Sequence, residues 1–516
     1  MDVLSQAFAL VFQWQVILAI FAAAGFGLLV GAIPGLTATM ATALLVPFAF
    51  FMDPVPAVGM MVTCAAMAIF AGDIPGILLR IPGTPASAAY ATEGYAMTQK
   101  GQAETALGAS LLFSAIGGLI GTFVLIFAAP VLAEIALNFS SAEYFWMALL
   151  GLTCAVFIGA SSPLKGMISL FIGLFVATIG LNNPAGVPRF TFGSSDLLAG
   201  VDFIPAMIGL FAVSVVLSSM AAGAPPWESP QKKTGNVLRA WGGLLRQYWP
   251  QQLRGSALGT VVGALPGAGA DIAAWIAYAV SRRFSRTPEK YGTGHVEGIV
   301  ECTSSNNAAV SSAWIPAFVF GIPGDTITAI VIGVLYVKGL NPGPTLFIFN
   351  PETIYAVFLI FILANLIMVP LGWMMIKMAT RMIQAPRRIL MPLILAFCVV
   401  GAYASNNSVY GIVIMLVFGV LGFIMEENDI PIAPCILGIV LGPIVEARFI
   451  SGMIRGDGSL LYFFERPIAA GLGLFVLAIW ALSLIGWLRR RRRGTAVSGE
   501  PSNSLQNPTQ GHHDFR

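Results

Sequence analysis

The chain has 516 residues, of which 57% are hydrophobic and only 10% are charged. Soluble domains carry about 25% charged residues, so this composition excludes an ordinary soluble protein and indicates a polytopic membrane protein. The net charge is only +3, and the basic residues are confined to a few loops and a tail. That distribution argues for control of membrane topology and against a nucleic-acid partner.

The beginning of the chain lacks the features of a cleavable signal. Residues 1–13 carry Asp2 and no basic residue before the apolar run that starts at Trp14. A signal needs a basic stretch ahead of its apolar run, so we expect the first run to remain as a membrane segment.

Apolar runs long enough, or nearly long enough, to cross a bilayer follow one another along the chain. They cover residues 14–33, 55–74, 106–132, 144–160, 167–181, 204–222, 354–376, 389–404, 409–425, 430–445 and 468–488. Shorter or polar-interrupted runs cover residues 36–51, 255–280 and 307–337. Because one helical crossing needs about 20 residues, we expect an all-α membrane protein with about 10–14 membrane segments.

Basic residues cluster between these runs, and the positive-inside rule places the clusters in the cytoplasm. They are Lys232, Lys233, Arg239, Arg246 and Arg254; Arg282, Arg283, Arg286 and Lys290; Lys377, Arg381, Arg387 and Arg388; and the run from Arg489 to Arg493. We predict a first transmembrane repeat at 1–222, a cytoplasmic loop at 223–253, a second transmembrane repeat at 254–488, and a basic, disordered cytoplasmic tail at 489–516.

The division into halves follows from two motifs that each occur twice and break a membrane helix with a Pro-Gly pair. The first motif contains Pro34-Gly35 and recurs with Pro266-Gly267, and the second contains Pro82-Gly83 and recurs with Pro323-Gly324. Proline removes a backbone donor, and glycine tolerates the unwound geometry. Such interruptions at matching places in two halves point to the binding site of a secondary transporter. Inverted halves are the commoner arrangement, and parallel halves remain the alternative.

The apolar run 255–280 lies between a basic cluster that ends at Arg254 and another that begins at Arg282. A simple span would place these clusters on opposite faces of the membrane. A re-entrant hairpin with its tip at Pro266-Gly267 resolves the conflict, because each arm is too short to cross alone but reaches mid-membrane. A single span with a proline kink and one mis-sided cluster is the alternative.

Several longer motifs are specific enough to suggest a family. They are the paired Gly-Ala-Ile-Pro-Gly-Leu and Gly-Ala-Leu-Pro-Gly-Ala-Gly-Ala-Asp segments, Ile81-Pro-Gly-Thr-Pro-Ala-Ser-Ala, Gly186-Val-Pro-Arg-Phe-Thr-Phe-Gly193 and Glu301-Cys-Thr-Ser-Ser-Asn-Asn307. Together they resemble the large membrane subunit of the tripartite tricarboxylate transporters. The resemblance implies a bacterial inner-membrane permease that imports a small organic anion, driven by an ion gradient. It also implies two partners, a small membrane subunit and a periplasmic solute-binding protein.

The chemistry of the breaks suits an anion. Helix N-termini carry unsatisfied N–H groups and a partial positive charge, which favour carboxylates. Helices that restart after the four Pro-Gly pairs are therefore expected to present their ends near one centre. The expected substrate-binding residues are Pro34, Gly35, Thr37, Pro82, Gly83, Thr84, Pro266, Gly267, Gly269, Pro323, Gly324, Asp325 and Thr326. For Asp325, a plain helix N-cap is the alternative interpretation.

The same breaks free carbonyl oxygens, which with side-chain oxygens are hard ligands suited to a sodium ion. The expected ligands are Thr39, Asp271, Ser304, Ser305, Asn306 and Asn307. Asp271 is the strongest candidate, because a carboxylate just inside an apolar helix is expensive. The simpler alternatives are a water-facing charge at a helix N-terminus for Asp271 and a polar helix cap for residues 304–307. Asp73, Glu301 and Glu446 rank lower and are expected to pair with Arg80, Arg448 or backbone groups.

No cofactor other than the coupling ion is expected, and no P-loop motif occurs, so ATP is not the expected energy source. Two other classes remain open. A stand-alone cation/proton antiporter would use Asp271 alone and need no binding protein. An intramembrane aspartyl protease is suggested by the spacing of Gly267, Gly269 and Asp271. It fits poorly, because that spacing is off by one residue and no Tyr-Asp pair supplies a second catalytic carboxylate. We therefore do not expect an enzyme.

Overall fold

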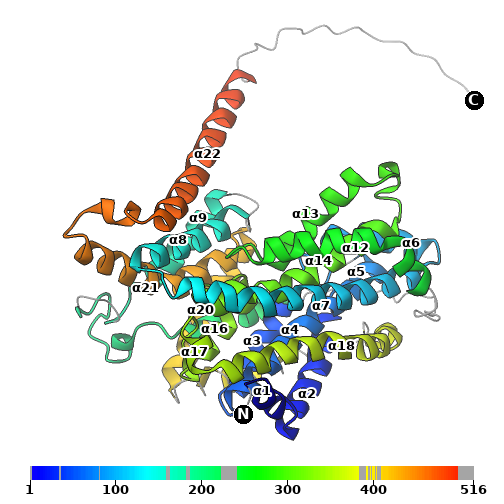
Figure 1. Ribbon diagram of the computed structural model, residues 1–516, viewed down its shortest axis with the longest axis horizontal. Coiled ribbons are helices and arrows are strands. Elements are labelled where there is room, and N and C mark those ends of the chain that lie inside the picture. Colours follow the sequence, from blue (N-terminus) through cyan, green and yellow to red (C-terminus); the bar gives the residue numbers. More distant parts are fainter. Residues whose placement is uncertain are drawn as a thin grey trace, which may run out of the picture.

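The computed structural model describes residues 3–33, 36–80, 82–158, 163–181, 186–221, 241–382 and 408–497, with short stretches between 391 and 403. Within these residues the chain is helical, and its only β-type pairing is one isolated bridge between Gly180 and Arg189. Six of the described helices are long and apolar enough to cross a membrane, and five shorter apolar helices accompany them. The predicted all-α polytopic membrane fold is therefore confirmed (Figure 1).

The helices of the first half are α1 Val3–Val11, α2 Trp14–Gly31, α3 Ala38–Ala49, α4 Pro54–Ala71, α5 Asp73–Leu79, η1 Ser87–Ala89, α6 Ala91–Gln99, α7 Ala103–Ala136, α8 Ser141–Ile158, α9 Pro163–Ala177, η2 Asp196–Ala199, α10 Phe203–Ile208, η3 Gly209–Val213 and α11 Ser214–Ala221. Those of the second half are α12 Trp241–Gly263, α13 Gly269–Phe284, η5 Pro288–Lys290, α14 Val296–Ser312, α15 Trp314–Phe320, α16 Thr326–Val337, α17 Leu346–Phe349, α18 Pro351–Met382, α20 Val409–Glu427, α21 Ile432–Arg455, η6 Leu460–Phe464 and α22 Pro467–Val497.

Most predicted apolar runs coincide with helices, for example 106–132 with α7 and 354–376 with α18. Residues 223–240 of the predicted inter-repeat loop and part of the predicted segment 389–404 lie outside the described residues. The long helix α22 projects away from the other helices and continues to Val497, past the predicted start of the tail at 489 (Figure 1). Residues 498–516 lie outside the description.

Glycines allow α2 to pack directly on α4. A Cβ atom added to Gly27 would lie 2.6 Å from the carbonyl oxygen of Cys64, and one on Gly31 would overlap the carbonyl of Ala68. Helices approach this closely in membranes when small residues line the contact. The repeated glycines of the first motif thus set the position of the helix that carries Pro34-Gly35.

The second copy of the motif makes the corresponding contacts between α12 and α14. A Cβ atom on Gly263 would lie 2.5 Å from the carbonyl oxygen of Ala309, and one on Gly259 would overlap the carbonyl of Ser305. Both Gly-x-x-x-Gly pairs, Gly27 with Gly31 and Gly259 with Gly263, therefore allow close packing of helices. A common origin of the two halves stays a prediction, whereas their matched contacts are a feature of the structure.

The two copies run in opposite directions. In α7 and α18, Leu111 faces Gly372 and Gly118 faces Asn365, so these two helices are antiparallel. Helix α14 is parallel to α7 and α4 is parallel to α18, as the paired contacts of their glycines show. These pairs are Gly117–Ser304 and Gly121–Ala308 for α7 and α14, and Gly59–Ile360 and Gly372–Phe70 for α18 and α4. Since α4 and α14 are antiparallel, the hairpins α2–α3 and α12–α13 enter from opposite ends, as expected for inverted halves.

The re-entrant hairpin predicted for residues 255–280 is present. The Arg254 guanidinium on α12 lies over the ring of Phe284 at the end of α13, 5.7 Å from its centroid. A single span would separate these two residues by the thickness of the bilayer. The alternative of one kinked span is therefore wrong.

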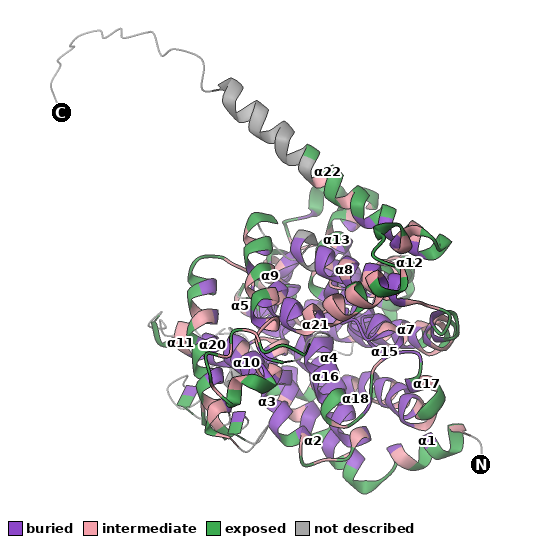
Figure 2. Cartoon of the chain, turned by 90° about the vertical axis from the view of Figure 1, so that its left-hand side faces the viewer, coloured by how far each residue is buried: buried purple, intermediate pink, exposed green. Residues whose placement is uncertain are grey.

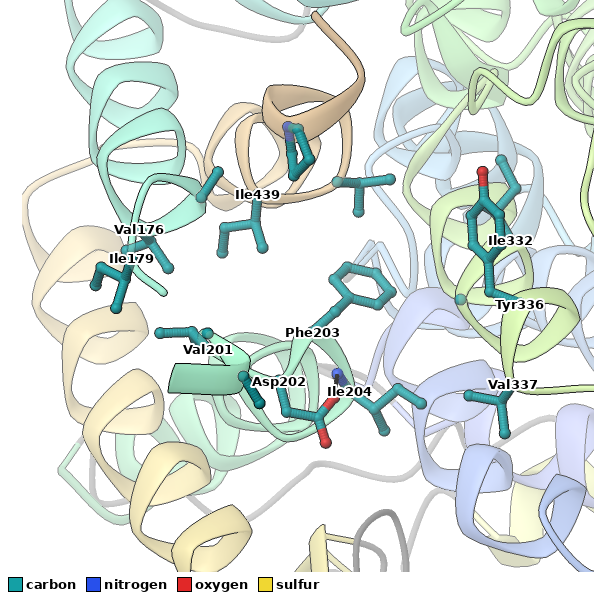
Figure 3. Close-up of a pocket in the computed structure, with 16 residues that line it drawn as sticks. Val176, Ile179, Val201, Asp202, Phe203, Ile204, Ile332, Tyr336, Val337 and Ile439 are labelled. Carbon is teal, nitrogen blue, oxygen red and sulfur yellow. Dashed lines mark hydrogen bonds between the residues drawn. The ribbon is translucent and has the colours of Figure 1, made fainter. Parts of the chain in front are cut away.

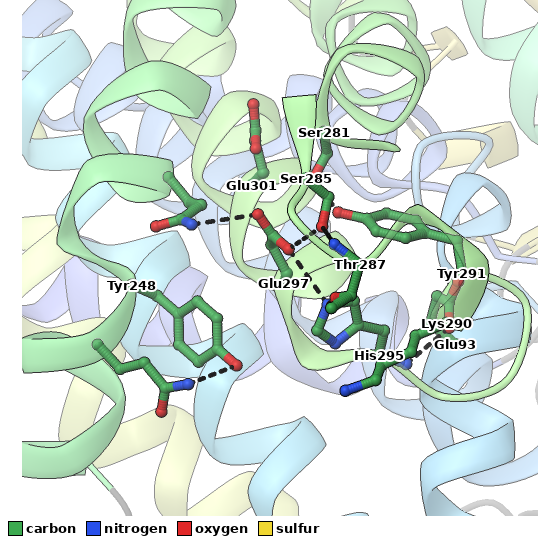
Figure 4. A network of polar contacts seen from close by, with 12 residues as sticks. Glu93, Tyr248, Ser281, Ser285, Thr287, Lys290, Tyr291, His295, Glu297 and Glu301 are labelled. Atoms are coloured by element: carbon green, nitrogen blue, oxygen red, sulfur yellow. Dashed lines mark hydrogen bonds and ion pairs between the residues drawn. The ribbon is translucent and has the colours of Figure 1, made fainter. Parts of the chain in front are cut away.

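Polar contacts hold the outer ends of this hairpin against the start of α14 (Figure 4). Glu301 accepts from Arg254 at 2.5 and 2.6 Å, and Glu297 accepts from Ser285 at 2.6 Å. Glu93, from α6 of the first half, accepts from the backbone N–H groups of Gly294 and His295, both at 2.8 Å. The loop that follows α13 is thus fixed to both halves.

Burial separates a protein interior from an apolar periphery (Figure 2). All residues of α4 from Val55 to Ala71 are buried. In contrast, Phe123, Phe127 and Val131 of α7 are exposed at one-turn spacing and present an apolar stripe to the outside. Large exposed apolar surfaces of this kind are compatible with a lipid environment and not with water.

Candidate functional site

The helix breaks of the second half touch each other. The backbone N–H of Gly267 donates to the carbonyl oxygen of Pro323 at 3.2 Å, which joins the hairpin tip to the second Pro-Gly pair. Gly267 and Gly269 have φ of 77° and 72°, a left-handed conformation that favours glycine. A Cβ atom on Gly269 would lie 3.1 Å from the Cβ atom of Asp325. Glycine at these positions therefore brings the start of α13 against the start of α16.

The breaks of the first half also adjoin. The N–H of Gly83 donates to the carbonyl oxygen of Gly72 at 3.1 Å, and a Cβ atom on Gly83 would lie 3.0 Å from the carbonyl oxygen of Gly31. The Pro82-Gly83 break is thus packed on the end of α2. Pro34 and Gly35, which follow that end, lie outside the described residues.

Side chains at the helix starts connect the two halves. Oδ1 of Asp271, in the first turn of α13, accepts from the backbone N–H of Ala86 at 3.1 Å. The hydroxyls of Thr39 in α3 and Thr326 in α16 lie 3.1 Å apart. The indole N–H of Trp275 donates to the carbonyl oxygen of Pro85 at 3.2 Å. These contacts bring the segments around all four Pro-Gly pairs to one place, which we call the central site.

The central site is open at the surface of the chain although its supporting helices are buried. Pro82, Pro85 and Asp271 are exposed, and Thr39 and Thr326 are partly exposed. Neither Asp271 nor Asp325 forms an ion pair with a described basic residue. The charge of Asp325 acts unfavourably on Asp271, so the central site holds two mutually repelling carboxylates.

Only three of the four breaks restart a long helix. Thr37 caps α3 by accepting from the N–H of Met40 at 3.1 Å, α13 begins at Gly269, and α16 begins after Asp325. Residues after Pro82-Gly83 form a single short turn closed by reciprocal hydrogen bonds of Thr84 and Ser87. The expectation of a fourth helix end is therefore wrong. A buried Tyr90 with φ of −125° interrupts the helix before α6 can begin.

Asp325 serves its own helix. Its Oδ1 accepts from the N–H of Thr328 at 2.7 Å, and the Thr328 hydroxyl accepts from the N–H of Asp325 at 2.8 Å. This reciprocal arrangement is a capping box, the structural alternative considered above. Thr84 and Ser87 form the same reciprocal pair at the corresponding place in the first half.

The polar run 304–307 lies in the middle of α14 and away from solvent. Ser304 donates to the carbonyl oxygen of Val300 at 2.8 Å, and Ser305 donates to that of Ala273 at 3.1 Å. The interpretation of this run as a polar helix cap is therefore wrong. Among the described residues, the two amide atoms of Asn306 and Oδ1 of Asn307 are buried and form no hydrogen bond of normal geometry. A role of these residues in holding sodium stays a prediction.

The side-chain partners of Asp73 differ from the Arg80 or backbone groups expected from the sequence. Its carboxylate accepts from the hydroxyls of Tyr90 and Ser110 and not from Arg80, which is exposed. The available signal was an acidic residue in the middle of the apolar stretch that runs on through α5. The other two lower-ranked carboxylates pair with arginines: Glu301 with Arg254, as above, and Glu446 with Arg189 at 2.8 and 2.9 Å.

A separate open cavity of about 290 Å³ lies between α9, α10, α16 and α21 (Figure 3). Its lining is mostly apolar and includes Val176, Phe203, Ile332 and Ile439. The carboxylate of Asp202 caps α10 by accepting from the N–H of Ile204 at 3.2 Å. This lining does not suit an anion, so the central site is the better candidate.

Inverted broken hairpins that meet at a solvent-accessible polar centre define a multi-pass membrane protein of the secondary-transporter class. Comparison with known proteins is more specific. Residues 17–437 match the model of the "Tripartite tricarboxylate transporter TctA family". The chain belongs to this family, which is a family of transporters and not of enzymes.

Two relatives come from Agrobacterium vitis. One, described as an uncharacterized 52.8 kDa protein in the TAR-I ttuC' 3'region, is 32% identical over 470 residues, which cover 90% of this chain and 92% of the relative. The other, an uncharacterized protein in the TAR-II ttuC' 3'region, is 32% identical over 234 residues, 45% of this chain and 97% of the relative. No solved structure matches the chain.

Proposed function

We propose that the protein is the permease subunit of a binding-protein-dependent secondary transporter in the bacterial inner membrane. It imports a small organic anion, a tricarboxylate or another carboxylate, together with sodium ions. Its partners are a small membrane subunit and a periplasmic solute-binding protein. The proposal extends the family assignment to the direction, the coupling ion and the partners of transport.

The observation that supports it best is the joining of broken helices from both halves through Asp271, Ala86, Thr39 and Thr326. The N-terminal ends of α3, α13 and α16 offer N–H groups and partial positive charge to a carboxylate. Because the contacts cross between inverted halves, movement of one half against the other changes the site itself. Such coupling of site and movement is what alternating access requires.

The two carboxylates of the central site argue for cation coupling. Asp271 and Asp325 without a described basic partner would repel an anionic substrate. A sodium ion bound by their oxygens removes this repulsion and makes substrate binding depend on the ion. The proton-antiporter alternative does not account for helix ends suited to anions, and the protease alternative does not account for an Asp325 that caps its own helix.

The test is uptake of radiolabelled citrate into proteoliposomes that contain the protein and the small membrane subunit, with the binding protein outside. We expect uptake that needs an inward sodium gradient and stops when the binding protein is omitted. Uptake without the binding protein, driven by a proton gradient alone, would instead support the antiporter. If citrate is not taken up, the same assay with dicarboxylates distinguishes two cases. Sodium-dependent uptake of a dicarboxylate would mean that only the choice of substrate was wrong.

A further inference from the structure

A second polar cluster lies out of solvent beside the 82–87 segment, where α4 passes into α5. Asp73 is only 1% exposed, and its two carboxylate oxygens accept from the hydroxyls of Tyr90 and of Ser110, the latter at 2.6 Å. No described lysine or arginine forms an ion pair with it. A carboxylate removed from water without a cation is costly within a membrane. The Asp73 carboxyl must therefore be neutralised by a proton or by a cation, which the described side chains do not supply.

Asn306 of α14 provides an independent observation. Its side chain lies near the Tyr90 hydroxyl and is 1% exposed, and neither amide atom forms a hydrogen bond of normal length and angle with a described residue. A buried polar group left without a hydrogen bond destabilises the folded protein. An orphaned amide next to an unpaired carboxylate indicates a missing ligand with positive charge.

The junction of α4 and α5 deprives one backbone carbonyl of its usual donor. Pro75, in the first turn of α5, has no N–H to donate to the carbonyl of Ala71 one turn earlier. Carboxylate, amide, phenol and carbonyl oxygens from these residues are hard ligands of the kind that sodium takes at broken helices. These oxygens come from α4 and α5 of the first half, from Tyr90 just before α6, and from α14 of the second half.

We propose that Asp73 and Asn306, with the Tyr90 hydroxyl, hold a second sodium ion, separate from the one proposed at Asp271. The inference rests on the proposed cation-coupled uptake and adds one cation to it. Tyr90 follows Ala86 in the same short segment, and Ala86 donates to Asp271. An ion at Asp73 therefore fixes the segment that completes the central site, and the two sodium sites bind cooperatively.

The test is equilibrium binding of radioactive sodium to the purified full-length protein in detergent, which requires neither partners nor transport. We expect Asp73→Asn to lose one bound sodium per chain, and Asp271→Asn to keep that sodium. Thr63→Val is the matched control, because Thr63, in the preceding helix α4, is also 0% exposed and takes no part in the hydrogen bonds of Asp73. It should bind sodium as the wild type does.

Asn306→Leu answers the question if Asp73→Asn does not fold, because leucine fills the space of the amide and removes an unsatisfied group. We expect about tenfold weaker binding of the second sodium, with normal thermal stability. Folded Asn306→Leu and Asp73→Asn that both bind the wild-type amount with wild-type affinity would overturn the proposal. The proposal would also be overturned if Asp73→Asn released one fewer proton in a pH titration but bound sodium as the wild type does. Asp73 would then carry a proton in place of sodium. A failure of citrate uptake by the wild type would count against the proposed function. It would not affect the sodium-binding test, which does not require transport.

Discussion

Asp271 and Ala86 lie 185 positions apart in the sequence, yet the carboxylate of one accepts a hydrogen bond from the backbone N–H of the other at 3.1 Å. The Thr39–Thr326 contact makes the reciprocal connection from the first half to the second. Each half therefore supplies a helix start that the other half completes. Mutations at either connection are expected to affect ion and substrate binding together.

The hairpin tip offers the most selective backbone test. Gly267→Val should reduce citrate uptake to background, because Gly267 has φ of 77° and a β-branched residue there costs about 1–2 kcal/mol and fills the space beside Pro323. Gly25→Val is the control, since a Cβ atom at Gly25 meets nothing within 4 Å. Both variants should reach the membrane in normal amounts. Normal uptake by a correctly inserted Gly267→Val protein would remove the tip from the site.

The charge of Asp271 can be removed while its hydrogen bond is retained. In Asp271→Asn the amide oxygen can still accept from Ala86, so we expect normal insertion but loss of an ion ligand. The sodium concentration for half-maximal uptake should rise at least about tenfold, equivalent to about 1.4 kcal/mol. Asp429→Asn serves as the control, because Asp429 is 84% exposed. An unchanged sodium dependence in Asp271→Asn would exclude Asp271 as a ligand.

The hairpin can be tested in intact cells with an impermeant thiol reagent. The native cysteines Cys64, Cys154, Cys302, Cys398 and Cys435 are free and buried, so they should react slowly. Gln247 and Lys290 are exposed and lie at the outer ends of the two hairpin arms, α12 and α13. The cysteines of the Gln247→Cys and Lys290→Cys proteins should react only from the cytoplasmic side.

Thr345→Cys is the control for the opposite side, because Thr345 is exposed near the start of α18, which is antiparallel to α7. This cysteine should react from the periplasm. Reaction of the Gln247→Cys and Lys290→Cys proteins from different sides would contradict both the hairpin and the direction of its arms.

The glycine contacts predict a stability effect at a distance from the site. Gly27→Ala should lower the free energy of unfolding by about 1–3 kcal/mol, because its Cβ atom would lie 2.6 Å from the backbone oxygen of Cys64. Gly25→Ala, with open space around it, should melt as the wild type does. Thermal unfolding in detergent measures both. Equal melting temperatures would show that α2 moves away from α4 at no cost.

Composition and motif repetition were sufficient to predict the helical class, the breaks and the hairpin. Apolar runs and Pro-Gly pairs act locally, and the conflict between Arg254 and Arg282 left a hairpin as the best solution. The same information could not predict the direction of the halves, because that depends on contacts such as Gly118–Asn365 between distant helices. It also could not show that Pro82-Gly83 is followed by a short turn, since the helix is interrupted at Tyr90, which lies outside the motif.

The candidate site was predicted in part for the same reason. Asp271 and Thr39 follow a motif and were identified from it, and Thr326 was identified from its neighbouring Pro-Gly pair. Asp73 has no motif, and its importance depends on Tyr90, Ser110 and Asn306, which three other segments bring to it. An acidic residue inside an apolar stretch is a local signal for Asp73, but burial without a counter-charge is a property of the folded chain.

Helix starts from both halves are proposed to form one site for anion and sodium. The most direct test is whether citrate and sodium protect the cysteines of the Thr39→Cys and Thr326→Cys proteins from a thiol reagent. The two hydroxyls lie 3.1 Å apart and both positions are partly exposed, so each cysteine should react with a small thiol reagent. We predict that citrate and sodium together slow both reactions to a similar extent, whereas citrate with potassium does not. Reaction rates that are unaffected by citrate and sodium at both positions, in proteins that still import citrate, would contradict the claim.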